Sequence, residues 1–481
     1  MPETLKKRSV KGTLWSFFDN GATQLIGFVI GIILARLLSP SDYGTVGVLS
    51  IFLAVANVFI DCGFGSGLIR KADRTEEDLS TAFYFNVLVG IIAYVILFFS
   101  APLVADFFRM PILVILLRVL ALCLVFNALS IVQQSLLTAN LNIKVQAKIN
   151  VGTQLPMGLV GIYFAYQGFG VWTLVIQQVG SSVLKTILLW IVAKWRPKHI
   201  WSQYSFHYLF NYGWKLLGAN LIGTIFGQIH SFFIGRTLGA SDLGYYSKAQ
   251  SLTNQPSTMI NSVVDRVVLP ILVDTHGNKT KIRNVYAKMM RSLTFCSFPL
   301  FLMLIALAKP IIIILWTDKW LKTVILFQIL AFAAPWGPIG SLNLCLLQLL
   351  NRTDLTLKLE FVKKPVTLIL LLIALPFGLE MIAVSAMVAS IYCIIVNMFA
   401  TKKLLRYGYK KQFRDIIPNM LLSIVVAAII YAVTTFISNN WVKCILGGML
   451  YCIMYIGVAK LLKYPALNEL GGLYKDVKKN K

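Results

Sequence analysis

Runs of about 20 apolar residues, separated by short polar connections, recur along nearly the whole chain. Each run is long enough to cross about 30 Å of hydrocarbon as a helix. We therefore predict an all-α polytopic membrane protein with about fourteen transmembrane helices. The expected spans lie near residues 13–36, 43–62, 81–104, 112–137, 149–166, 169–193, 211–235, 243–265, 285–308, 321–350, 361–378, 380–400, 416–436 and 441–462.

Two segments 200 residues apart match without a gap. Residues 35–44 read Ala-Arg-Leu-Leu-Ser-Pro-Ser-Asp-Tyr-Gly, and residues 235–244 read Gly-Arg-Thr-Leu-Gly-Ala-Ser-Asp-Leu-Gly. Six predicted spans separate the copies, so the chain runs in the same direction in both. Parallel repeats of this kind are typical of transporters, with a cavity between the two halves. We predict a six-helix N-terminal lobe (1–200), a six-helix C-terminal lobe (201–408), and two additional helices with a basic tail (409–481).

Composition excludes a soluble protein. The 481 residues are 57% hydrophobic and 13% charged, whereas soluble domains carry about 25% charged residues. The net charge of +26 does not indicate a nucleic-acid partner, because Lys and Arg fall mainly in alternate loops. That bias predicts that both termini lie in the cytoplasm. We interpret the basic N-terminus as a tail before a retained helix rather than as a cleaved signal.

The eighth predicted span, residues 243–265, is unusually polar. Such a helix cannot face lipid, because each unpaired polar group in hydrocarbon costs several kcal/mol. We expect it to line water or another helix and to contact a substrate. The alternative is an amphipathic helix on the membrane surface. The candidate substrate-binding residues in this segment are Tyr245, Tyr246, Lys248, Asn254 and Gln255.

Charged residues inside other spans are further candidates. Arg118 and Lys185, together with Lys248, would make a cationic cavity suited to a phosphate or pyrophosphate. The alternative is that their charges reach the membrane surface along flexible side chains. The acidic candidates, which we assign to ion coupling, are Asp19, Asp61 and Asp265.

The repeated turns contain a second set of charged residues. We expect a structural role for them, as a local salt bridge or helix cap at an outer turn. These residues are Arg36, Asp42, Arg236 and Asp242.

Signals of enzymatic activity are absent from the sequence. The four histidines have no metal-ligand spacing, and there is no Walker A loop or Gly-x-Ser-x-Gly motif. The seven cysteines are scattered, nearly all of them in apolar runs, and we read them as small buried residues. We expect no metal and no cofactor. Transport energy must then come from an ion gradient, with Na⁺ and H⁺ as candidates, from the membrane potential or from the substrate gradient.

Several segments carry a resemblance to a known family. Four segments resemble the polysaccharide-transporter family. They are residues 35–44, Gly-Phe-Gly-Ser-Gly-Leu-Ile-Arg-Lys at 63–71, Thr-Glu-Glu-Asp-Leu-Ser-Thr-Ala-Phe at 75–83 and Gly-Phe-Gly-Val-Trp-Thr-Leu-Val at 168–175. In particular, the chain resembles Wzx-type lipopolysaccharide, O-antigen and colanic-acid flippases of the multidrug/oligosaccharidyl-lipid/polysaccharide exporter superfamily, which implies a location in the bacterial cytoplasmic membrane. The pattern is strong over residues 10–200 and weaker beyond.

This resemblance implies two six-helix lobes forming a V, plus two extra helices. It also implies an undecaprenyl-pyrophosphate-linked oligosaccharide as substrate, moved from the inner to the outer leaflet. We hypothesise a flippase, not an enzyme, that works by alternating access and is associated with polysaccharide polymerase machinery. The rivals are an ion-coupled multidrug or organic-cation antiporter of the same superfamily, a membrane glycan polymerase or ligase, and a membrane scaffold that transports nothing.

Overall fold

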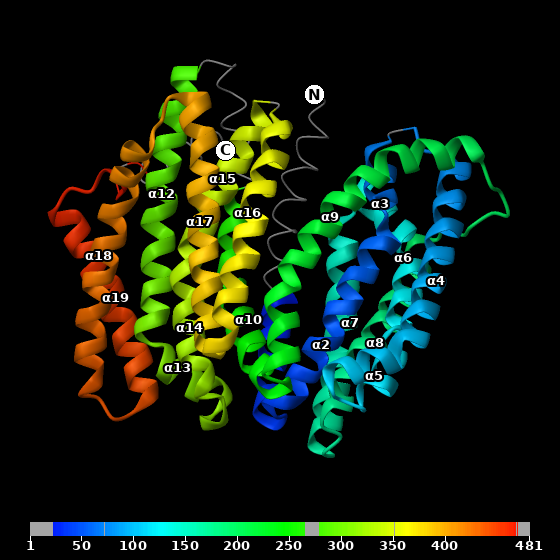
Figure 1. Ribbon diagram of the computed structural model, residues 1–481, viewed down its shortest axis with the longest axis horizontal. Helices are drawn as coiled ribbons and strands as arrows, with labels where there is room; N and C mark the ends of the chain where they lie inside the picture. Colours follow the sequence, from blue (N-terminus) through cyan, green and yellow to red (C-terminus); the bar gives the residue numbers. More distant parts are fainter. Residues whose placement is uncertain (1–22, 72, 265–278, 351, 468, 470–481) are drawn as a thin grey trace. The chain divides into compact units, whose positions relative to one another are not determined.

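The computed structural model describes residues 23–71, 73–264, 279–350, 352–467 and 469. Every element within these residues is a helix (Figure 1), which confirms the all-α prediction. The described chain divides into two compact units, one ending at Gly244 and the other beginning at Tyr245.

The first unit contains an apolar helix, Thr23–Leu37, and eight further helices. These are α2 (Pro40–Asp61), α3 (Phe64–Arg70), α4 (Glu76–Phe108), α5 (Leu113–Leu120), α6 (Leu122–Ala139), α7 (Ile143–Tyr166), α8 (Val171–Ala193) and α9 (Gln203–Thr237). Helix α9 packs against α2, α3 and α4. By packing, the seventh predicted span therefore belongs to the first unit, although by sequence it begins the second repeat.

Helix α10 (Ala240–Val263) crosses the boundary between the units and continues into the second. The remaining helices of the second unit are α12 (Lys279–Ala306), α13 (Ala308–Trp316), η2 (Asp318–Trp320), α14 (Lys322–Ala333), η3 (Ala334–Trp336), α15 (Gly337–Leu349), α16 (Thr353–Ala374), η4 (Leu375–Phe377), α17 (Leu379–Leu405), α18 (Tyr409–Thr435) and α19 (Asn440–Leu461). The predicted span 321–350 is thus two helices joined by a single 3₁₀ turn at Pro335.

Ten of the described helical segments are long and apolar enough to cross a membrane, which leaves the predicted count of fourteen unconfirmed. The first predicted span is only partly described. Three others are helices of 22 to 24 residues whose polar content keeps them out of the ten, namely α7, α10 and α16. Their polar residues are therefore of particular interest for function.

Capping residues fix where helices α2 and α4 begin. Ser39 caps α2, and its hydroxyl and backbone N–H both donate to the Asp42 carboxylate. Thr75 caps α4 in the same way through Asp78. Each pairing satisfies backbone donors that a helix start would otherwise leave without partners.

The last two helices pack on the second unit's core rather than standing apart. Figure 1 shows α18 and α19 beside α12, and the core includes Tyr286 of α12, Ile430 of α18 and Tyr451 of α19. Polar contacts add to this packing. Asn419 Nδ2 donates to Thr294 Oγ1 at 2.8 Å, and Tyr455 OH donates to the Phe295 carbonyl at 3.1 Å.

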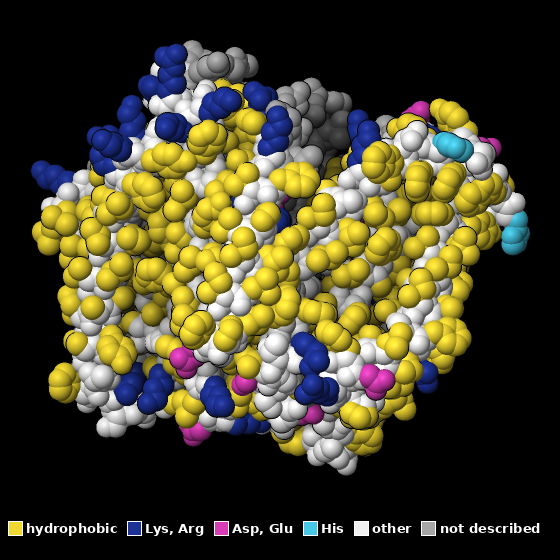
Figure 2. All heavy atoms as spheres, viewed as in Figure 1, with side chains coloured by type: hydrophobic (Ala, Val, Ile, Leu, Met, Phe, Trp, Pro, Cys, Tyr) yellow, Lys and Arg dark blue, Asp and Glu magenta, His cyan; other side chains and the backbone are white. Residues whose placement is uncertain are grey.

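Apolar side chains cover the sides of the helices. Figure 2 shows them as a broad zone, with Lys and Arg gathered at the helix ends of the second unit near the top of the view. Large side chains such as Phe99 (73% exposed), Leu103 (72%) and Phe436 (90%) point outward. So much exposed apolar surface is incompatible with water and fits helices surrounded by lipid.

Candidate functional site

Helix α10 presents a continuous polar face along three turns. Its six side chains recur at the spacing of one helix face, and together they line a hollow of about 340 Å³. The set is Ser247, Gln250, Ser251, Asn254, Gln255 and Thr258. Two of the predicted substrate-binding residues, Asn254 and Gln255, therefore lie in one hollow built of amides and hydroxyls, which can donate and accept hydrogen bonds.

Lys248 lies on an adjacent face of α10, against two tryptophans. Its ammonium is 5.4 Å from the ring centre of Trp316, which ends α13, and 5.8 Å from that of Trp320 in η2. Indole rings stabilise a cation in this position and shield it from bulk water. The arrangement places the Lys248 side chain beside the polar face of α10.

The two predicted tyrosines of α10 are placed differently. Tyr245 packs edge-on against Trp320, with ring centres 5.9 Å apart, and the Lys322 ammonium lies 5.8 Å from the Tyr245 ring centre. Tyr246 is buried, with 1% of its surface exposed. Tyr245 thus belongs to the aromatic cluster around Lys248, whereas Tyr246 belongs to the core.

A second polar hollow lies between α2 and α9 in the first unit. It has a volume of about 500 Å³, and its polar lining residues are Asn57, Asp61, Asn220 and Thr224. Asn127 of α6 donates to Asn57 Oδ1 at 3.0 Å. Asp61, predicted for ion coupling, therefore sits among amide and hydroxyl oxygens, the ligand types that hard cations prefer.

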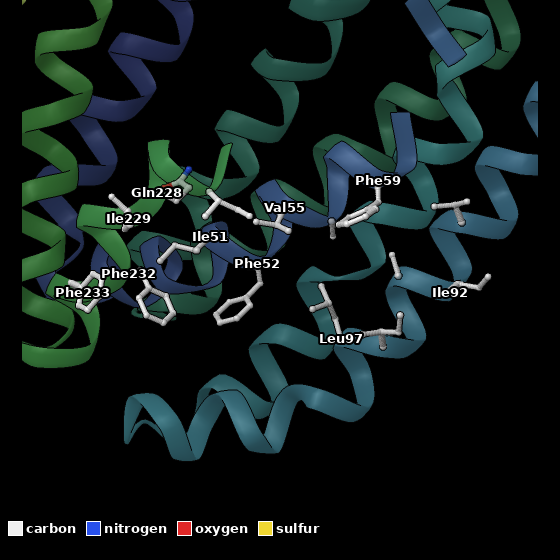
Figure 3. A pocket seen from close by; sticks show the side chains of 15 residues that line it. Ile51, Phe52, Val55, Phe59, Ile92, Leu97, Gln228, Ile229, Phe232 and Phe233 are labelled. Carbon is white, nitrogen blue, oxygen red and sulfur yellow. The ribbon is translucent and has the colours of Figure 1, made fainter. Parts of the chain in front are cut away.

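The opposite face of the same helix pair borders an apolar groove of about 670 Å³ (Figure 3). Side chains of α2, α4 and α9 line it, including Phe52, Phe59, Ile92 and Phe232. Gln228 is the one polar residue among its fifteen lining residues. Successive residues on a helix differ by about 100°, which places the groove and the polar hollow on opposite sides of α2 and of α9. The pair therefore separates a polar from an apolar environment.

The other two predicted basic residues, Arg118 and Lys185, lie in the first unit. Neither of them lines the hollows or the groove described above. The Arg118 guanidinium is 4.3 Å from the ring centre of Phe98, and Nε donates to the Phe98 carbonyl at 3.3 Å. Arg118 thus connects α5 to α4. Lys185 is half-buried in α8. The predicted acidic residues Asp19 and Asp265 lie outside the described residues.

The repeated turns occupy helix ends. Asp42 completes the cap of α2, Asp242 lies in the first turn of α10, and Arg236 packs on the Phe107 ring, with its guanidinium 4.9 Å from the ring centre. Arg36 is in the last turn of the helix Thr23–Leu37.

The first residues of α2 and α10 approach each other closely within the first unit. A Cβ added to Gly44 would lie 1.6 Å from the Ala240 carbonyl oxygen, and one added to Gly244 would lie 1.9 Å from the Pro40 oxygen. Both contacts follow the 200-residue repeat, because Pro40 corresponds to Ala240 and Gly44 to Gly244. Only glycine allows backbones to come this close.

Sequence reasoning missed a charged cluster in α16. Lys363, 5% exposed, donates to Glu360 and to Asn397 Oδ1 of α17, the latter at 3.1 Å, and Lys364 pairs with Glu360 at 3.3 Å. The predicted span 361–378 includes both lysines but begins after Glu360, whereas α16 begins at Thr353. The spacing of Glu360 to Lys363 and Lys364, three and four residues apart, was the available signal for a helix.

The polar hollow between α2 and α9 was only partly anticipated. Asp61 was predicted, and Asn57 lies four residues before it on the same helix face, but the sequence did not indicate Asn220 and Thr224 of α9 as their neighbours. Within the described residues, no group of three His, Cys, Asp or Glu side chains could hold a metal ion.

A family model described as "Polysaccharide biosynthesis protein" matches residues 33–325. The chain is 27% identical over 355 residues to the teichuronic acid biosynthesis protein TuaB of Bacillus subtilis, covering 73% of each chain. It is 22% identical over 362 residues to the lipopolysaccharide biosynthesis protein WzxC of Escherichia coli, covering 75% of this chain and 74% of that one.

Two kinds of solved structure share the fold. The inward closed conformation of the lipid II flippase MurJ aligns with a TM-score of 0.74 at 16% identity, covering 94% of this chain and 99% of that one. An inward-facing multidrug resistance transporter of the MATE family aligns with a TM-score of 0.63 at 15% identity, covering 80% and 96%. These likenesses confirm the predicted all-α fold of a multi-pass membrane protein.

Proposed function

The chain belongs to the polysaccharide biosynthesis protein family, and from this membership we propose that it is a flippase for lipid-linked oligosaccharides. Its substrate is an oligosaccharide repeat unit on undecaprenyl pyrophosphate, moved from the cytoplasmic to the outer leaflet by alternating access. A glycan cannot cross hydrocarbon unaided at a useful rate, because its hydroxyls would lose their hydrogen bonds to water.

The observation that carries this proposal is the polar face of α10. A helix of 24 residues with six amide and hydroxyl side chains along one hollow offers the hydrogen bonds that sugar hydroxyls require. Among the residues that line this hollow there is no carboxylate, and a cation antiporter would need one. The face therefore favours a glycan over an organic cation.

Lys248 binds the pyrophosphate in this proposal. It is the one predicted basic residue on the same helix as the hollow, and its cationic head lies against Trp316 and Trp320. Lys185 is the second candidate. Arg118 is less available to a substrate, because its guanidinium already contacts Phe98.

We assign energy coupling to the hollow that contains Asp61. Its carboxylate, with Asn57, Asn220 and Thr224, provides oxygen ligands for Na⁺ or an exchangeable proton. Asp19 and Asp265 remain predicted partners of this role. We place the protein in the bacterial cytoplasmic membrane, with both termini in the cytoplasm and the glycan polymerase machinery as a partner.

Deleting the gene and following radiolabelled lipid-linked glycan tests the function in cells. The precursor should accumulate in the inner leaflet and return to normal when the gene is supplied in trans. If labelled glycan reaches the outer leaflet at the normal rate without the protein, the proposal fails.

A further inference from the structure

A groove of about 470 Å³ lies between α16, α17 and the first residue of α18, away from the α10 hollow in sequence and lining. Its walls are apolar, and its long axis follows one face of each helix. The apolar lining residues are Leu355, Leu359, Val362, Ile395, Val396, Phe399 and Ala400. We propose that this groove binds one anionic phospholipid, with an acyl chain in the groove and the phosphate between Lys358 and Lys403.

The groove opens outward along its length. Phe399 and Val362 are each 52% exposed, whereas Ala400 forms a buried floor. In a membrane, an open apolar groove on the outside of the protein is in contact with lipid chains. Its volume lies in the range of sites that hold small molecules, and its wall on α16 extends over only about two turns. It is too short to seat a helix of a partner protein.

Two lysines lie at the polar end of the groove. Helices α16 and α17 are joined by a short turn and run in opposite directions (Figure 1). Because side chains tilt toward the start of their own helix, Lys358 on α16 and Lys403 on α17 lean toward each other along the groove. Both line it and both are exposed.

These two charges are not neutralised within the described part of the chain. Glu360, two residues after Lys358 in the sequence, is paired with Lys363 and Lys364. None of the ion pairs between described residues includes Lys358 or Lys403. Apolar walls that also carry two lysines match an amphiphile with an anionic head, and basic sites between membrane helices bind such lipids.

Phospholipid is the occupant favoured over the transported lipid. The groove's lining has no amide or hydroxyl apart from the Tyr409 phenol, so it offers little to a glycan head group. The proposal does not depend on which substrate is transported, and its failure would leave the flippase proposal intact.

The test uses the full-length protein in phosphatidylcholine vesicles containing a small amount of phosphatidylglycerol with a photoreactive acyl chain. Cross-links should map to peptides of α16 and α17, and photoreactive phosphatidylcholine should give few at the same site. Each lysine adds roughly a fivefold preference for an anionic lipid. The double variant Lys358→Gln/Lys403→Gln should therefore weaken phosphatidylglycerol labelling about thirtyfold.

A matched control is Lys410→Gln/Lys411→Gln, which removes the same charge from exposed residues that do not line the groove. This variant should label as the wild type does. Val362→Trp, at an exposed position, should fill the groove and reduce labelling by both lipids. This variant tests the groove without changing any charge.

Three results would overturn the proposal. One is equal labelling by the two phospholipids in the wild-type protein. Another is an equal loss of labelling in the control double variant. The third is displacement of phosphatidylglycerol by equimolar undecaprenyl phosphate, which would make the groove a site for the transported lipid.

Discussion

Lys248 lies on the unusually polar helix α10, with its side chain packed against two indole rings. The rings of Trp316 and Trp320 lie within 6 Å of its ammonium, and each such contact contributes about 0.5–2 kcal/mol depending on solvent. An ammonium forms a stronger, charge-assisted hydrogen bond with a phosphate than a neutral donor does.

Replacing Lys248 by Gln should lower the initial flipping rate at least about tenfold, because a hydrogen bond to a charged group contributes about 1.5–3 kcal/mol. Lys322→Gln is the matched control, since Lys322 is exposed and contacts Tyr245 of the same aromatic cluster. Both variants should reach wild-type membrane levels. Unchanged flipping by Lys248→Gln at normal expression would remove this residue from the mechanism.

Gly44→Ala should destabilise the protein by about 2 kcal/mol or more, because the new methyl would lie 1.6 Å from the Ala240 oxygen and force the backbones apart. Thermal unfolding in detergent measures this effect. Gly31→Ala is the control, as nothing lies within 4 Å of its added Cβ, and alanine is the better helix former. Equal melting temperatures for both variants would contradict the close approach.

At the scale of helices, α10 shows how much the sequence could predict. Its polarity marked it as functional, and the structure divides that polarity between a hollow lined by Asn254 and Gln255 and a face carrying Lys248. The division was not predictable, because Trp316 and Trp320 lie some 70 residues away and reach α10 only through tertiary packing. The start of α16 at Thr353 was not predicted, because the charges of Glu360, Lys363 and Lys364 made this segment look too polar for a membrane span. These three residues pair with one another only once the helix has formed.

The polar face of α10 supplies a prediction for the whole helix. Asn254→Leu/Gln255→Leu should reduce flipping roughly thirtyfold, since each lost hydrogen bond costs about 1 kcal/mol. The helix should persist, because Leu favours helices more than Asn does. Ser257→Ala is a control outside the hollow, as the Ser257 hydroxyl donates to the Thr253 carbonyl of its own helix. If the double variant flips at the wild-type rate, sugar binding does not involve this face.

The start of α4 provides a stability test. Lys71 Nζ donates to the buried Asp78 carboxylate at 2.6 Å, next to the cap formed with Thr75. Removing one partner, as in Asp78→Ala, should cost about 3–5 kcal/mol, measured by thermal unfolding. Lys71→Met/Asp78→Ala should recover part of this loss, because no unpaired charge then remains. A double variant less stable than the single one would contradict the pairing.

The pH dependence of this ion pair follows from Lys71. Burial alone would lower the pKa of Lys71, but the hydrogen bond and charge of Asp78 outweigh burial and raise it above its usual value. The lysine's contribution to stability is therefore fully present below its unfolded-state pKa and is lost only as pH rises through the raised value. Wild-type and Lys71→Met proteins should differ in melting temperature at neutral pH and converge at strongly alkaline pH.

At the scale of the molecule, the sequence predicted the helical class, the membrane location and the family. Apolar length and the resemblance of residues 35–44 and 63–71 were sufficient for these. The repeat predicted a division near residue 200, whereas packing divides the described chain at Gly244, because α9 buries Leu209 in the core of the first unit. A repeat records how the chain was duplicated, and only three-dimensional contacts decide with which helices a span packs.

Movement of the lipid-linked glycan from the inner to the outer leaflet, measured with the purified protein, tests the central claim most directly. The full-length chain is reconstituted into vesicles with an undecaprenyl-pyrophosphate-linked oligosaccharide in the inner leaflet, and its glycan is detected from outside with an impermeant lectin. The account predicts that lectin-accessible glycan appears much faster than in protein-free vesicles, and slowly with Lys248→Gln. Exposure at the protein-free rate, in vesicles where the protein is folded and an imposed Na⁺ or H⁺ gradient is present, would contradict it.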